Sequence, residues 1–247
     1  MRYPEAPYRS RNRKPKKAMK TLLLLLSFCA VSGAALAFAP QEKESRFTQA
    51  KSKLTTSKEA VIVKQLPSYP LTTCVVSNEG LGEMGEPINL VYEGRLVRLC
   101  CKGCVKQLKK NPKPALAKVD KAVVKSQMDG YPFETCIVSD EPLDADDKPL
   151  DYVYGTRLVR LCCKGCVKGF KKDPNKFMDK LDMGLIQAQL KDYAMETCLM
   201  RGEELGDDPV NFLYGTRLVR VCCKRCMKGF HKSPERNVAR LDAAKKK

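Results

Sequence analysis

The chain has 247 residues, a formal net charge of +18, thirteen cysteines, one histidine and no tryptophan. Aromatic residues are few (7%), which argues against a single core of domain size. A cysteine-rich chain of this kind is normally stabilised by disulfides or by metal ions. It contains no Gly-rich phosphate loop, Ser/His/Asp set or paired carboxylates, so we do not expect an enzyme.

Residues 1–37 have the three parts of a secretory signal peptide. A basic start precedes the apolar run Leu22–Leu26, and the small residues of Ala35-Leu36-Ala37 end the segment. We expect cleavage after Ala37 and export to the periplasm or the extracellular space. Because Met19-Lys20 is also a natural beginning, residues 1–18 are either an extended basic region or the product of a start codon assigned too early.

Two alternatives keep this segment on the protein. The uncharged stretch 22–39 is just long enough to span a bilayer as an uncleaved anchor. A lipid anchor on Cys29 is less favoured, because Phe28 stands where a small residue is expected. In each case the body of the protein is delivered outside the cytoplasm, and only this segment touches the membrane.

Residues 38–67 are polar and rich in Lys, Ser, Thr and Gln, so we expect a linker. Three repeats follow, which we assign to module 1 (68–128), module 2 (129–190) and module 3 (191–247, ending in a Lys-rich tail). The repeats begin at Tyr69, Tyr131 and Tyr193. Modules 1 and 2 share the pattern Cys-x25-Cys-Cys-x2-Cys, and module 3 is two residues shorter in an acidic loop.

Module 2 illustrates the elements that we expect in each repeat. Residues 151–154 and 157–161 read as two strands around a Gly-Thr turn. A short helix follows the cysteine pair, and Asp173-Pro174 supplies a capping residue and a first-turn proline for a second helix. That helix has Phe177, Leu181, Leu185 and Ile186 at helical spacing. The expected fold is therefore α+β: three tandem small Cys-rich modules, each a knuckle, a β-hairpin and two helices.

Each module has four cysteines whose spacing can hold a metal ion. Cys101 and Cys104 lie three residues apart at a helix start, where both sulfurs can face one point and where the helix N-terminus favours thiolates. Folding of the hairpin can bring Cys74 to the same point. With His231 expected to be an exposed helix residue, the ligands are sulfur, which favours Zn²⁺, Cu(I) or another thiophilic ion, up to one per module. The candidate ligands are Cys74, Cys100, Cys101, Cys104, Cys136, Cys162, Cys163, Cys166, Cys198, Cys222, Cys223 and Cys226.

The pattern resembles the TRASH and YHS group of small metal-binding domains. The shared features are a lone Cys, a Tyr-x-Gly hairpin, a Cys-x3-Cys motif, an aromatic residue four positions later and an Asp/Asn-Pro helix start. The resemblance implies a treble-clef-like fold and a role in heavy-metal sensing, transport or trafficking. It also implies the ligand sets Cys74/Cys100/Cys104, Cys136/Cys162/Cys166 and Cys198/Cys222/Cys226. The extra Cys101, Cys163 and Cys223 stand where the family often has Ser, so the choice within each adjacent pair stays open, and all four cysteines of a module are candidates.

The main alternative is a framework of six disulfides, since export leads to an oxidising compartment and the modules contain an even number of cysteines. The favoured function is an exported metal-binding protein that sequesters or hands over thiophilic ions. The second hypothesis is an envelope structural or interaction protein, stapled by disulfides or zinc, whose basic surface binds an anionic partner. A third, a cytoplasmic zinc-finger protein acting on nucleic acid, requires that residues 1–37 do not direct export, and nucleic acid is therefore not our expected partner.

Overall fold

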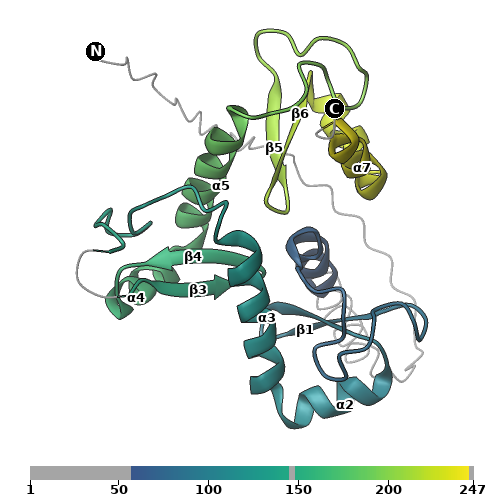
Figure 1. Cartoon of the computed structure of the whole chain (residues 1–247), viewed down its shortest axis with the longest axis vertical. Coiled ribbons are helices and arrows are strands. Elements are labelled where there is room, and N and C mark those ends of the chain that lie inside the picture. Colours follow the sequence, from purple (N-terminus) through teal and green to yellow (C-terminus); the bar gives the residue numbers. More distant parts are fainter. Residues whose placement is uncertain (1–56, 145–147, 245–247) are drawn as a thin grey trace, which may run out of the picture. The chain divides into compact units, whose positions relative to one another are not determined.

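The computed structural model describes residues 57–144 and 148–244. The expected signal peptide, the linker up to residue 56 and the tail 245–247 lie outside the described residues. Within them, the chain forms a mixed α+β fold of three repeated Cys-rich modules (Figure 1), which confirms the predicted fold class.

Each module contains one two-stranded antiparallel sheet. The strands are β1 (Ile88–Tyr92), β2 (Arg95–Leu99), β3 (Leu150–Tyr154), β4 (Arg157–Leu161), β5 (Val210–Tyr214) and β6 (Arg217–Val221). The predicted hairpin of module 2 is confirmed, with β3 starting one residue earlier than expected. Gly155 has a φ of 63° at the turn, a conformation that glycine adopts without strain.

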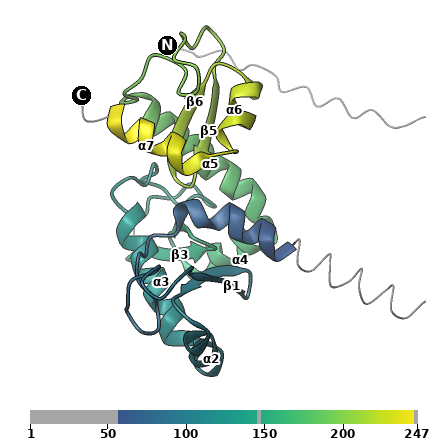
Figure 2. The same ribbon diagram turned by 90° about the vertical axis from the view of Figure 1, so that its right-hand side faces the viewer.

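A short helix and a longer helix follow each hairpin, and Figure 2 labels both helices of module 3. The helices are α2 (Lys102–Lys110), α3 (Pro112–Gln127), α4 (Lys164–Lys172), α5 (Pro174–Leu190), α6 (Lys224–Phe230) and α7 (Pro234–Ala244). The predicted cap at α5 is present, because the side chain of Asp173 accepts a hydrogen bond from the N–H of Lys176. At α3 the corresponding Asn111 makes no side-chain cap, although proline still occupies the first turn.

Each module has its own small core, built around its cysteines. In module 2 the ring of Phe170 is fully buried and packs near Phe177, with Leu181 and Leu185 also in the core. Two of the four apolar positions predicted for α5 are therefore buried; the other two, Phe177 and Ile186, are half-buried. The second strand of every hairpin buries three of its five residues. Two of these are adjacent in sequence and thus point to opposite faces, so both faces of the strand are covered.

The end of the expected linker is helical. Residues 57–65 form a helix and Leu66–Ser68 form the 3-10 turn η1. The stretch has no strong apolar period of its own, and tertiary contacts stabilise it. The side chain of Gln65 reaches the hairpin of module 1, where it accepts a hydrogen bond from the N–H of Leu96 (2.8 Å) and donates to the carbonyl of Gly94 (2.8 Å).

The same glutamine contact recurs at each hairpin. Gln127, at the end of α3, accepts from the N–H of Leu158 (2.9 Å) and donates to the carbonyl of Thr156 (2.8 Å). Gln189, near the end of α5, makes the same pair of bonds with Leu218 and Thr216. A helix thus precedes every hairpin as well as following it. Consistent with this, the buried side chain of Leu158 in β4 belongs to the core of module 1, next to α3.

Candidate metal centres

The first cysteine of each module lies in a tight turn, the predicted knuckle. The carbonyl of Cys74 accepts a hydrogen bond from the N–H of Asn78 at 2.9 Å, and an isolated bridge between Thr73 and Gly80 closes the loop. Asn78 has a φ of 67°. In modules 2 and 3 the equivalent positions are Asp140 and Gly202, also at positive φ. Asn, Asp and Gly are the residues that enter this region most readily, so the turn is encoded locally.

The other cysteines lie where the hairpin passes into the short helix. In module 1, Cys100 directly follows β2, Cys101 is the N-cap of α2, and Cys104 occupies the first turn of that helix. The backbone of Cys101 is extended, with φ −154° and ψ 168°. Cys163 and Cys223 have nearly the same conformation at the starts of α4 and α6.

Three sulfurs of each module converge, and we call each such set a triad. Within a triad all three Sγ atoms lie within 4.8 Å of one another. Thiolates bound to one Zn²⁺ at ~2.3 Å lie about 3.8–4.0 Å apart, so each triad is close to the size that an ion requires. The triads are Cys74/Cys100/Cys104, Cys136/Cys162/Cys166 and Cys198/Cys222/Cys226.

The remaining cysteine of each module, which we call its fourth cysteine, is not part of this set; it is Cys101, Cys163 or Cys223. The Sγ of Cys101 is nevertheless 3.7 Å from the Sγ of Cys104, and the Sγ of Cys163 is 3.7 Å from that of Cys166. In module 3 the Sγ of Cys223 lies 3.8 Å from that of Cys222. The grouping that includes the first cysteine is thus the one implied by the family resemblance, while the pair suggested by local spacing is also close.

All twelve module cysteines are free thiols in the described residues. The closest sulfurs, Cys100 with Cys104 and Cys162 with Cys166, are 3.6 Å apart. A covalent S–S bond is about 2.05 Å long, so these distances belong to neighbouring thiols. The spacing is that of atoms able to share an ion.

The first cysteines ionise more readily than a free thiol. Burial raises the pKa of Cys74, but hydrogen bonds from the side chain and backbone of Ser77 and from neighbouring N–H groups outweigh it and lower the pKa from 9.0 to about 6. Ser139 helps in the same way to lower the pKa of Cys136 to about 6. A thiolate is the form that binds metal, so these positions favour a cation.

The cysteine in the first turn of each short helix behaves in the opposite way. Two causes raise the pKa of Cys104, Cys166 and Cys226 to about 12. Burial is the larger one, and the neighbouring sulfurs, which disfavour a second negative charge, are the other. Without a cation, the triads of modules 1 and 2 therefore hold one thiolate each near neutral pH and retain their other protons. An ion that enters must displace these protons, which couples binding to pH.

Module 3 differs from the others beside its triad. In modules 1 and 2 a serine hydroxyl contacts the second triad cysteine: Ser77 with Cys100 at 3.3 Å and Ser139 with Cys162 at 3.4 Å. Arg201 takes this position in module 3 and pairs with Glu203 at 2.7 Å. Glu203 is the main cause that raises the pKa of the Arg201 guanidinium, and Cys222 and Cys226 contribute less. The third centre thus has a cation beside its sulfurs.

His231 lies apart from these centres. It caps the C-terminus of α6, is exposed, and its ring centroid is 5.5 Å from those of Phe212 and Phe230. No triad includes it.

Sequence reasoning identified the module tyrosines only as landmarks. The hydroxyl of Tyr69 accepts a hydrogen bond from the N–H of Arg98 (3.2 Å), and the Arg98 guanidinium lies over the ring at 6.0 Å. Burial raises the pKa of Tyr69, which keeps the hydroxyl neutral. Tyr131 and Tyr193 make the same contacts in their modules. The tyrosine thus links the residues just before the knuckle to the edge of the hairpin, and its fixed position five residues before the first cysteine was the available signal.

Comparisons with protein-family models, with curated proteins and with solved structures give no match to this chain. Among the helices of residues 57–144 and 148–244, none is both long enough and apolar enough to cross a bilayer.

Proposed function

We propose that this chain is an exported, non-catalytic protein that holds thiophilic ions, one in each module, for sequestration or hand-over. The observation that carries the proposal is the convergence of three sulfurs in each module, from a knuckle and a helix start more than 20 residues apart. Three repetitions of the same arrangement favour a capacity for several ions over a single structural staple.

The ligands define the class of ion. Three thiol groups with no histidine or carboxylate in the set suit Zn²⁺ or Cu(I), whereas Mg²⁺ and Ca²⁺ prefer oxygen. Membership of the TRASH/YHS group is part of this proposal. It is supported by the order of knuckle, hairpin and helix and by the grouping of the three positions that the family implies in each module.

Export is the second part of the proposal, and it rests on the basic start, apolar run and Ala35-Leu36-Ala37 of residues 1–37. The mass of the mature protein, purified from its native envelope or medium, tests it. We expect a chain that begins at Phe38. A full-length chain recovered from the cytoplasm would contradict export.

Native mass spectrometry of protein purified without chelator tests ion binding. We expect up to three ions per chain. The variant C136S should lose the ion of module 2, and the matched variant C74S should lose the ion of module 1. A chain that binds no ion when reduced and supplied with Zn²⁺ or Cu(I), or that is isolated with six disulfides, would overturn the proposal.

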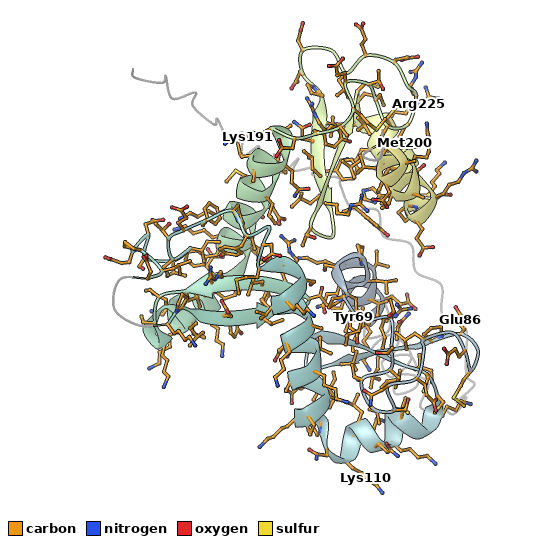
Figure 3. All side chains as sticks on the ribbon, viewed as in Figure 1. Tyr69, Glu86, Lys110, Lys191, Met200 and Arg225 are labelled. Atoms are coloured by element: carbon orange, nitrogen blue, oxygen red, sulfur yellow. The ribbon has the colours of Figure 1, made fainter. Side chains whose placement is uncertain are left out.

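One observation favours the second candidate function, an interaction protein with an anionic partner. All four lysines of α2 are exposed (Lys102, Lys106, Lys109, Lys110), and Figure 3 shows Lys110 extending from the end of that helix. This hypothesis predicts ions that are held permanently and salt-sensitive binding to anionic vesicles or polymers. Exchange of bound Zn²⁺ for added Cd²⁺ separates the two functions, because a permanent staple would not exchange.

A further inference from the structure

The most deeply buried sulfurs of the triads are difficult to reach from solvent. The first cysteine of each module, Cys74, Cys136 or Cys198, is fully buried. Cys100, Cys104 and Cys226 are also buried, with 4%, 6% and 7% of their surface exposed, whereas Cys162, Cys166 and Cys222 are half-buried. An incoming ligand therefore has little access to a bound ion from the side of these buried sulfurs.

The fourth cysteine offers that access. Cys163 is exposed, and Cys101 and Cys223 are half-buried. Each lies at the N-cap of the short helix, outside the mutual 4.8 Å of the triad but within 3.7–3.8 Å of one triad sulfur. The position is thus intermediate between the buried ion site and solvent.

The residue two positions after this cysteine lies beside its sulfur, at ordinary contact distance. A Cβ added at Gly103 would lie 3.6 Å from the Sγ of Cys101, and one at Gly165 would lie 3.5 Å from the Sγ of Cys163. Module 3 has Arg225 at the matching place, labelled in Figure 3, and there the Sγ of Cys223 is close to Cys222. In every module this sulfur interacts with both triad cysteines beside it in sequence, Cys100 and Cys104 in module 1 and Cys222 and Cys226 in module 3, so it lies where it can replace either of them as a ligand.

We infer that Cys101, Cys163 and Cys223 are exchange ligands, through which a thiophilic ion enters and leaves its triad. This inference rests on the proposed function. In module 1, a bond from the ion to the Sγ of Cys101 forms as that thiol gives its proton to solvent, and the bond to the Sγ of Cys104 breaks as that sulfur takes up a proton. The oxidation state of the ion does not change. The ion is then held in part by a sulfur that an acceptor thiol or chelator can reach.

The experiment compares the reduced, Zn²⁺-loaded full chain with the variant C101S/C163S/C223S. Zn²⁺ release to the chromophoric chelator 4-(2-pyridylazo)resorcinol is followed by stopped-flow absorbance. We expect the variant to bind the same number of ions but to release them about 10-fold more slowly, which corresponds to a barrier to release that is higher by about 1.4 kcal/mol. The matched control C74S/C136S/C198S should instead lose bound ions.

Unchanged release rates would overturn the inference, because the fourth cysteines would then be bystanders. Loss of ions from C101S/C163S/C223S would overturn it too, because the residues would then be permanent ligands. If that triple variant does not fold, the single variant C163S carries the test, with one third of the released Zn²⁺ expected in a slower phase. A wild-type chain that binds no ion would instead refute the proposed function itself.

Discussion

The side-chain amide of Gln127 accepts a hydrogen bond from the backbone N–H of Leu158, 31 residues further along the chain. The same amide donates to the carbonyl of Thr156, so one side chain satisfies two backbone groups that a two-stranded sheet leaves unpaired at its edge. Because Gln127 ends the last helix of module 1, this contact joins consecutive modules.

Replacement of this glutamine should destabilise the protein. In Gln127→Ala the N–H of Leu158 and the carbonyl of Thr156 lose their partner in a half-buried place, and we expect a loss of about 1–3 kcal/mol in the free energy of unfolding. Urea unfolding of the ion-loaded chain, followed by circular dichroism, measures it. Gln107→Ala, an exposed position in α2, is the control and should change little. Equal stability of the two variants would show that the amide contact has no energetic role.

Ion binding should release protons in a number that depends on pH. The pKa of Cys74 is lowered to about 6, whereas that of Cys104 is raised to about 12 and that of Cys100 is also raised. At pH 7.5 only the first of these thiols is already ionised, so Zn²⁺ should displace about two protons per triad in modules 1 and 2. Below pH 6 all three thiols are protonated and the number should approach three, so affinity falls more steeply as the solution becomes acidic.

Calorimetric titration in buffers of different ionisation enthalpy counts these protons. The variant C74S supplies the control. Its module 1 no longer forms a triad, so the number of protons that it releases at pH 7.5 should be lower by about two, the share of one triad. A proton count that is constant between pH 5 and 8 would contradict the assignment of the first cysteine as the thiolate of the ion-free centre.

Arg201 should strengthen ion binding in module 3. A Zn²⁺ bound by three thiolates leaves one net negative charge, which a nearby guanidinium stabilises. In a C74S/C136S background, which retains only the third triad, Arg201→Ser should weaken Zn²⁺ binding by about 2- to 5-fold, the range expected for an exposed charge. Competition with a chelator of known affinity measures the change. Arg236→Ser, on the exposed face of α7, should leave the affinity as it is; an equal loss in both variants would indicate only a general charge effect.

Cys163 should be the first cysteine that alkylating reagents modify in the ion-free chain. It is exposed, and the hydrogen bond from the backbone N–H of Cys166 lowers its pKa, while burial raises the pKa of Cys166 itself to about 12. A lowered pKa gives more thiolate near neutral pH, and the thiolate is the reactive form. We expect iodoacetamide at pH 7.5 to label Cys163 well before Cys166, as peptide mass spectrometry would show. Faster labelling of Cys166 would mean that the two sulfurs have exchanged roles.

Much of the module could be predicted from local signals. Gly155-Thr156 between Val- and Leu-rich segments predicted the hairpin, and Asp173-Pro174 predicted the start of α5. The cysteine spacing predicted a shared site. These features depend on residues close together in sequence, and the threefold repetition made each signal easier to recognise.

The contacts between modules could not be predicted in this way. Gln65, Gln127 and Gln189 also recur at intervals of 62 residues, but a polar residue on a helix usually faces solvent, and only the folded chain shows that these amides meet a sheet edge. The helix 57–65 was missed for the same reason. Local spacing favoured Cys101 with Cys104, and only the family resemblance implied Cys100 with Cys104, because that grouping depends on the extended backbone of Cys101, which spacing does not encode.

The burial of Leu158 in the core of the preceding module has a practical and an evolutionary consequence. A recombinant fragment that starts at residue 129 would leave this leucine without α3, so a better fragment of module 2 would begin near residue 112. A gene segment copied in that frame, from one long helix through the next hairpin, would produce ends that already fit each other. Such an array could lengthen by whole copies without the design of any new junction.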